Sequence, residues 1–159
     1  MRRARDVAIF VSILAFSRIL GAQQRSSSET PCAQTARMRI YSNAFAHEET
    51  GDILGDEFAI KSNRDSTADI LLYVYEGAPD DEGIPLSGRI SGKQLAAQGT
   101  WVERGVEYPA KQEVIENHAV KINGTLDATS FRGDIRIEDM NSPDNVRLKR
   151  VKKLWFCKR

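Results

Sequence analysis

Apolar and polar residues alternate along most of the chain, the pattern of strands with one buried and one exposed face. The alternation is clearest in the last third, at residues 120–126, 131–137 and 146–148. Earlier stretches show it at residues 38–40, 58–60, 84–90 and 95–101. After Arg150 the phase changes, and Leu154 and Phe156 resume it, which predicts a β-bulge near Arg150 and a last strand that reaches Phe156.

Residues 70–75 are apolar on both faces and therefore predict a central strand. Short turn-forming stretches separate the strands, such as residues 76–83 with Gly, Pro and Asp. Residues 112–118 fit a helix or a strand equally well. About eight strands at this spacing predict an all-β domain over residues 36–159, an antiparallel up-and-down β-barrel or a sandwich.

Glycines inside two of the later alternating runs, Gly124 and Gly133, allow the strong coiling that a small closed barrel needs. The segment 120–137 that contains them resembles the late hairpins of lipocalin-like (calycin) barrels. The resemblance concerns architecture over about 18 residues. The early Gly-x-Trp of that family is missing, because Trp101 and Trp155 both lie late in the chain. The resemblance therefore implies a barrel and transfers no ligand-binding residue.

The start of the chain has the three parts of a secretory signal peptide. Arg2, Arg3 and Arg5 precede an apolar run at residues 7–16, and small residues precede Gln23. The run is too short for a permanent anchor across a bilayer of about 30 Å. We therefore expect a signal peptide at 1–22, a flexible lead at 23–35, and a secreted or periplasmic protein without a permanent membrane anchor after cleavage. An uncleaved anchoring helix is the alternative.

The chain has two cysteines, Cys32 and Cys157, close to the two ends of the expected mature protein. An even number of cysteines in an oxidising compartment favours a disulfide. Such a bond would place the first and last strands side by side, which closure of a barrel requires. Two unpaired thiols are the alternative.

Charge excludes a general polyanion binder. The whole chain carries a net charge of +1, and loss of residues 1–22 removes four arginines and Asp6, leaving about −2. Although seven positively charged residues lie in the last 13 positions, the negative net charge of the expected mature protein predicts no nucleic-acid partner.

No spacing of residues typical of a catalytic, metal or cofactor site is present, so the sequence predicts none. His47 and His118 are the only histidines, and the HExxH spacing of zinc hydrolases is absent. We expect a non-enzymatic barrel that binds a small apolar ligand or an extracellular protein. Two alternatives stay open: a hydrolase-type enzyme with a carboxylate/histidine site at His47 or His118, and an inhibitor or adhesin acting through its loops. The residues expected to line a ligand cavity are Ile70, Leu72, Val74, Trp101, Ile122, Phe131 and Ile135.

Overall fold

The computed structural model describes residues 30–77, 82–107, 112–140 and 144–158. The expected signal peptide at 1–22 and residues 23–29 of the expected lead lie outside these ranges. The described residues form α1 (Pro31–Thr35), β1 (Arg39–Ser42), β2 (Phe45–Ala46), β3 (Ile53–Ser62), β4 (Thr67–Gly77), β5 (Ile84–Ser91), β6 (Gln94–Glu107), β7 (Gln112–Leu126), β8 (Ser130–Ile137), β9 (Val146–Val151) and the 3₁₀ helix η1 (Trp155–Lys158).

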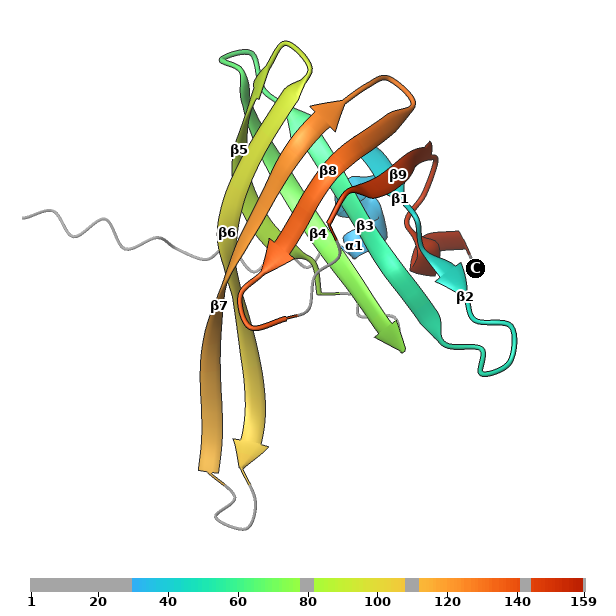
Figure 1. The fold of residues 1–159 in the computed structure, drawn as a ribbon, viewed down its shortest axis with the longest axis vertical. Coiled ribbons are helices and arrows are strands. Elements are labelled where there is room, and N and C mark those ends of the chain that lie inside the picture. Colours follow the sequence, from blue (N-terminus) through green and yellow to red (C-terminus); the bar gives the residue numbers. More distant parts are fainter. Residues whose placement is uncertain (1–29, 78–81, 108–111, 141–143, 159) are drawn as a thin grey trace, which may run out of the picture.

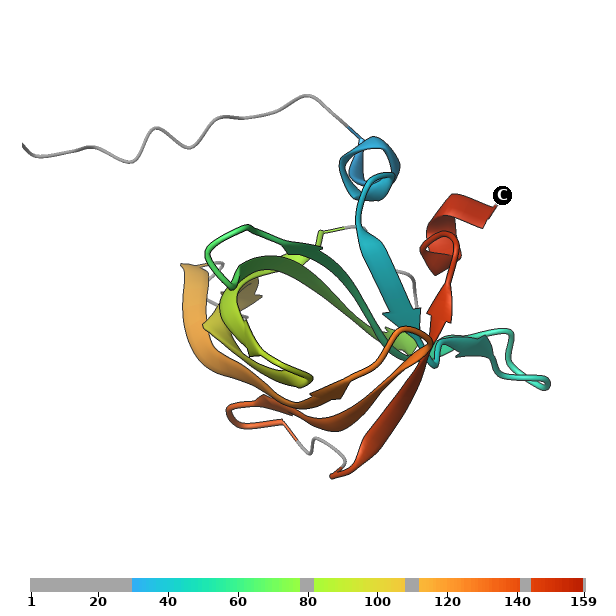
Figure 2. The ribbon, with the colours of Figure 1, turned by 90° about the horizontal axis from the view of Figure 1, so that it is seen from above.

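The strands form a closed antiparallel barrel, which confirms the predicted fold class. Strands β3 to β9 are neighbours in chain order, and β1 lies between β9 and β3, so eight strands complete the circle (Figure 2). The two-residue strand β2 adds to β3 outside the circle. Because β6 and β7 are the longest strands, their hairpin extends well beyond one end of the barrel (Figure 1).

The alternation in the sequence follows from this closed wall, because successive side chains point into and out of the barrel. In β8, Phe131 and Ile135 are buried inside, whereas Arg132 and Arg136 face solvent. Strand β1 differs from β8 because both of its faces are buried. Its Tyr41 points into the barrel core, and Ile40 packs on the outside.

Aromatic side chains fill one end of the barrel. The ring of Phe58 lies between those of Tyr41 and Phe131, at centroid distances of 5.3 and 5.2 Å. The Tyr41 hydroxyl donates a hydrogen bond of 2.9 Å to the carbonyl of Asp127, in the turn between β7 and β8. Gly124 leaves room for this packing, since a Cβ there would lie 2.8 Å from Phe131 and would also meet the backbone of Arg132. This end of the barrel is therefore closed.

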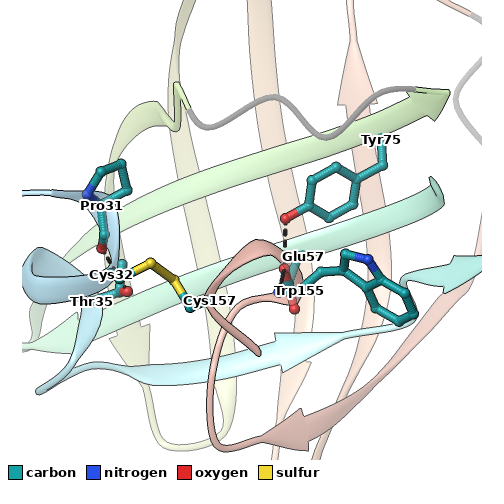
Figure 3. The surroundings of a disulfide bond; sticks show 7 residues. All are labelled: Pro31, Cys32, Thr35, Glu57, Tyr75, Trp155 and Cys157. Atoms are coloured by element: carbon teal, nitrogen blue, oxygen red, sulfur yellow. Dashed lines mark hydrogen bonds between the residues drawn. A yellow bond between two sulfur atoms is a disulfide. The ribbon is translucent and has the colours of Figure 1, made fainter. Parts of the chain in front are cut away.

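A second apolar cluster, the outer cluster, covers the outside of β1, β3 and β4. Its buried members are Ile40, Ile53, Ala59, Tyr73, Tyr75 and Leu154. This cluster explains why residues 70–75 are apolar on both faces, as one face lines the barrel and the other meets the C-terminal segment. The buried Glu57 carboxylate accepts hydrogen bonds there from the Tyr75 hydroxyl (2.7 Å) and the Trp155 backbone N–H (2.8 Å) (Figure 3).

The disulfide between Cys32 and Cys157 is present, with a Cα–Cα distance of 5.7 Å, as the sequence predicted. It joins α1 to η1 on the outside of the barrel (Figures 2 and 3). The helix α1 occupies the end of the segment 23–35 that was expected to be a flexible lead, and its Thr35 is buried. The first and last strands, β1 and β9, are paired as expected.

Two details of the predicted C-terminal strand are wrong. The chain forms η1 where the strand was expected to reach Phe156. The pairing of Lys149, Arg150 and Val151 with β1 is continuous, so there is no bulge at Arg150. The phase changes because Val151 and Leu154 pack in the outer cluster instead of the barrel interior. Neither helix of the described ranges is long and apolar enough to cross a membrane.

Candidate functional site

The end of the barrel opposite the aromatic rings contains a cavity of about 180 Å³. Five apolar side chains and two carboxylates line it: Val74, Glu76, Glu82, Ile84, Trp101, Ile137 and Met140. They come from the end of β4, the connection between β4 and β5, the start of β5, the middle of β6, the end of β8 and the turn that follows β8. We call this cavity the mouth pocket. Its volume is below the 300–1,000 Å³ of typical small-molecule sites, so it suits a small ligand.

Carboxylates make the surroundings of the mouth pocket negative. Glu76 and Glu82 are exposed members of its lining. Asp56 lies two residues before Phe58, on the face of β3 that points into the barrel. Burial, and secondarily the charge of Glu76, raise the pKa of Asp56 from 3.8 to about 6. Three acidic groups therefore converge on this end of the barrel.

A histidine lies beside the mouth pocket, at the base of the β6–β7 hairpin. His118 is paired with Trp101 across the two strands, and their rings lie 5.2 Å apart at an angle of 36°. Its Nε2 is 3.4 Å from a carboxylate oxygen of Glu103 and 3.8 Å from one of Glu116. Its Nδ1 is 3.8 Å from an oxygen of Asp139. The side chain is 10% exposed, and neither nitrogen has a hydrogen-bond partner among the described residues.

The residues expected to line a cavity divide into two groups. Val74 and Trp101 line the mouth pocket. The other five are buried in the packed barrel core: Ile70, Leu72, Ile122, Phe131 and Ile135. Alternation identifies inward-facing positions, but it does not distinguish those that pack against each other from those that border a cavity.

Several residues of the site were not predicted. Glu76 continues the inward-facing series of Ile70, Leu72 and Val74, so its position could have been found from the same alternation. Met140 follows β8 in a turn and gives no periodic signal. Glu103 and Glu116 meet only because β6 and β7 pair in one particular register.

The two histidines are not brought together. His47 lies in the turn between β2 and β3, which both views place on the other side of the barrel from the β6–β7 hairpin (Figures 1 and 2). A site shared by His47 and His118 therefore has no support in the arrangement of these elements.

Two larger hollows, of about 490 and 430 Å³, lie on the outside of the barrel wall. Exposed polar side chains such as Lys121 and Arg136 border the first, and Arg89 and Gln98 the second. Ile137 and Met140 border both the first hollow and the mouth pocket, but neither hollow is lined by an aromatic side chain. We therefore regard the mouth pocket, which contains Trp101, as the candidate ligand site.

Comparison of the chain with models of protein families, with curated protein sequences and with solved structures found no match in any of the three.

Proposed function

We propose that this protein is an exported, non-enzymatic, lipocalin-like barrel that binds a small, mainly apolar ligand with a positively charged group. The observation that carries the proposal is the mouth pocket, where apolar side chains and the carboxylates of Glu76 and Glu82 line one small cavity. Mouths of β-barrels are frequent ligand sites.

The apolar part of the ligand would contact Val74, Ile84, Trp101 and Met140, which gain free energy when both surfaces leave water. The positive group would lie near Glu76 and Glu82. The Trp101 ring adds to this preference, because the face of an indole attracts cations. An anionic ligand would meet only repulsion from these carboxylates.

Two observations support export. The residues at 1–22 have the composition of a signal peptide. The disulfide between Cys32 and Cys157 is typical of oxidising compartments such as the periplasm or the extracellular space. The closed eight-stranded antiparallel barrel supports the lipocalin-like assignment at the level of architecture.

Three probes of nearly equal shape test the ligand class: 2-phenylethylamine, 2-phenylethanol and 3-phenylpropionate. Binding would be followed by tryptophan fluorescence in a Trp155→Phe variant, in which the remaining tryptophan, Trp101, reports on the mouth pocket. We expect the amine to bind at least about tenfold more tightly than the alcohol, which corresponds to about 1.4 kcal/mol. The carboxylate should bind most weakly.

Glu76→Gln is the matched variant for the charge. It should weaken binding of the amine and leave that of the alcohol nearly unchanged. A fluorescence signal insensitive to all three probes would contradict the ligand site, and tighter binding of 3-phenylpropionate would contradict the charge preference.

A further inference from the structure

We propose that His118, Glu103 and Glu116 form a binding site for a divalent transition metal, with Zn²⁺ as the best fit. The site lies at the base of the β6–β7 hairpin, beside the mouth pocket and distinct from its lining. The inference goes beyond the proposed ligand binding and does not depend on it.

The distances between the three groups suit a single small cation. One ligand atom from each residue lies within 4.8 Å of the other two, and the Nε2 of His118 is 3.4 and 3.8 Å from the glutamate oxygens. In tetrahedral zinc sites with bonds of about 2.0–2.2 Å, neighbouring ligand atoms are about 3.3–3.6 Å apart. The distance from His118 Nε2 to the Glu103 carboxylate oxygen already lies in this range. The exposed glutamates need only small side-chain movements to complete the site.

His118 supplies a second, independent observation. Its side chain is nine-tenths buried, yet neither ring nitrogen has a hydrogen-bond partner among the described residues. An imidazole buried in this way loses its bonds to water without replacement, which costs free energy. A metal bound at Nε2 would supply the missing interaction there.

The Nδ1 atom of His118 faces a different group, the carboxylate of Asp139 at 3.8 Å. Histidine ligands commonly donate their other N–H to a carboxylate, which fixes the tautomer and the orientation of the ring. Asp139 is exposed and can approach closely enough to accept this bond. The Trp101 ring packs against the imidazole and restricts its rotation further.

The pairing of Glu103 with Glu116 is a third argument. The two residues are directly opposite each other in the β6–β7 ladder. Like charges at directly opposed positions destabilise a sheet. A cation between the two carboxylates turns this repulsion into attraction, so the pairing is explained if the site binds metal.

The donor set selects among metals. Mg²⁺ and Ca²⁺ prefer oxygen ligands only, whereas an imidazole with carboxylates suits Zn²⁺ and Cu²⁺. Thiolate ligands are excluded because both cysteines are in the disulfide. Three protein ligands leave a fourth position of a tetrahedral zinc open to solvent or to a small molecule.

Isothermal titration of chelator-treated, tag-free protein with ZnCl₂, CuCl₂, CaCl₂ and MgCl₂ tests the proposal. We expect one Zn²⁺ per chain, with Ca²⁺ and Mg²⁺ bound at least about tenfold more weakly. Co²⁺ in place of Zn²⁺ should give the intense visible absorption of a four-coordinate site. His118→Ala should weaken Zn²⁺ binding by more than about 100-fold, since loss of a ligand should exceed the 10–100-fold effect of losing an outer partner. Asp139→Asn should weaken Zn²⁺ binding by only about 10–100-fold, because Asp139 is an outer partner of His118.

The control variant is His47→Ala, which should bind Zn²⁺ like the parent because His47 lies on another part of the barrel. Should His118→Ala fail to fold, the double variant Glu103→Gln/Glu116→Gln keeps the test, because both side chains are more than half exposed. A folded variant of either kind that binds Zn²⁺ as tightly as the parent would overturn the proposal, as would a parent that binds none. Titration of the metal-free protein with 2-phenylethylamine measures ligand binding by itself. Failure of the metal proposal can therefore be distinguished from failure of the ligand-binding proposal.

Discussion

Glu57 is a charged residue in a place that normally excludes charge. It is completely buried, on the outward face of β3, beneath the C-terminal segment (Figure 3). One carboxylate oxygen, Oε2, accepts hydrogen bonds from both Tyr75 and Trp155, whereas Oε1 has no partner among the described residues. A buried carboxylate is tolerated when hydrogen bonds replace its water. Glu57 thus links β3, β4 and η1 through one atom.

Glu57→Ala should lower the free energy of unfolding by about 3–6 kcal/mol, because two hydrogen bonds to a charged group contribute roughly 1.5–3 kcal/mol each. Glu57→Gln keeps an acceptor oxygen and should lower the free energy of unfolding by less than half as much as Glu57→Ala. Urea denaturation of both variants measures the difference, with the exposed Glu48→Ala as control. Equal losses for the alanine and glutamine variants would mean that the two hydrogen bonds are not the source of the stability.

Asp56 makes stability depend on pH. Its pKa is 3.8 when unperturbed and about 6 in the folded protein, raised by burial and by Glu76. Between these values the folded protein holds the proton more tightly than the unfolded chain does. The stabilising contribution of the protonated group is therefore complete below about pH 4 and is lost as the pH rises through about 6. The change in pKa corresponds to a loss of at most about 3 kcal/mol, and partial exposure of the carboxyl group reduces it.

Asp56→Asn should remove this dependence. Relative to the variant, the parent should lose about 1–3 kcal/mol of unfolding free energy between about pH 4.5 and pH 7.5. Urea denaturation at the two pH values checks the difference. Glu76→Gln should reduce the dependence without abolishing it, because Glu76 is the smaller of the two causes. Parallel curves for the parent and Asp56→Asn would contradict the assignment.

At the scale of elements, two short helices outside the barrel are held by the disulfide and by the outer cluster. Helices of five and four residues, as in α1 and η1, are not stable by themselves in water. Leu154 and Phe156 pack in the outer cluster, and the bond between Cys32 and Cys157 ties the two helices together. None of these contacts involves the lining of the mouth pocket.

Cys157→Ser should therefore lower the unfolding free energy by about 2–5 kcal/mol without changing the fold. The double variant Cys32→Ser/Cys157→Ser should lose the same amount, because either change removes the single bond. Thermal unfolding followed by circular dichroism measures the loss, and ligand binding at Trp101 should persist below the transition. A single variant that melts like the parent would show that the bond contributes nothing.

The sequence predicted the strands wherever one face is inside the barrel and the other in solvent. It also predicted the strand at residues 70–75 correctly, although both faces of β4 are covered there. The prediction was undecided or wrong in two other places. Residues 112–118 fitted a helix or a strand because this part of β7 belongs to the projecting hairpin, which has no barrel core on its inner face (Figure 1). The C-terminal segment was assigned to a strand because apolar residues that pack on the outer cluster resemble those that face a barrel.

At the scale of the molecule, the two ends of the barrel differ in chemistry. Tyr41, Phe58 and Phe131 fill one end, and carboxylates surround the cavity at the other. This difference was not predictable from alternation. A shift of two residues between paired strands leaves every side chain on the same face, so alternation alone does not show that Trp101 meets His118 or that Glu103 meets Glu116.

The joined ends also determine how the molecule bears mechanical load. A force that pulls on the two termini passes from Cys32 to Cys157 through the sulfur atoms, so no strand of the described barrel carries it. The 125-residue loop between the two cysteines would be about 400 Å long when extended, but the force cannot extend it until the disulfide is reduced. Reduction would transfer the force to β1 and β9, whose pair Ile40 and Val151 lies where the chain enters and leaves the barrel. The ladder would then separate one pair at a time, at low force. Single-molecule pulling should show the lengthening of about 400 Å only in reductant or in Cys157→Ser.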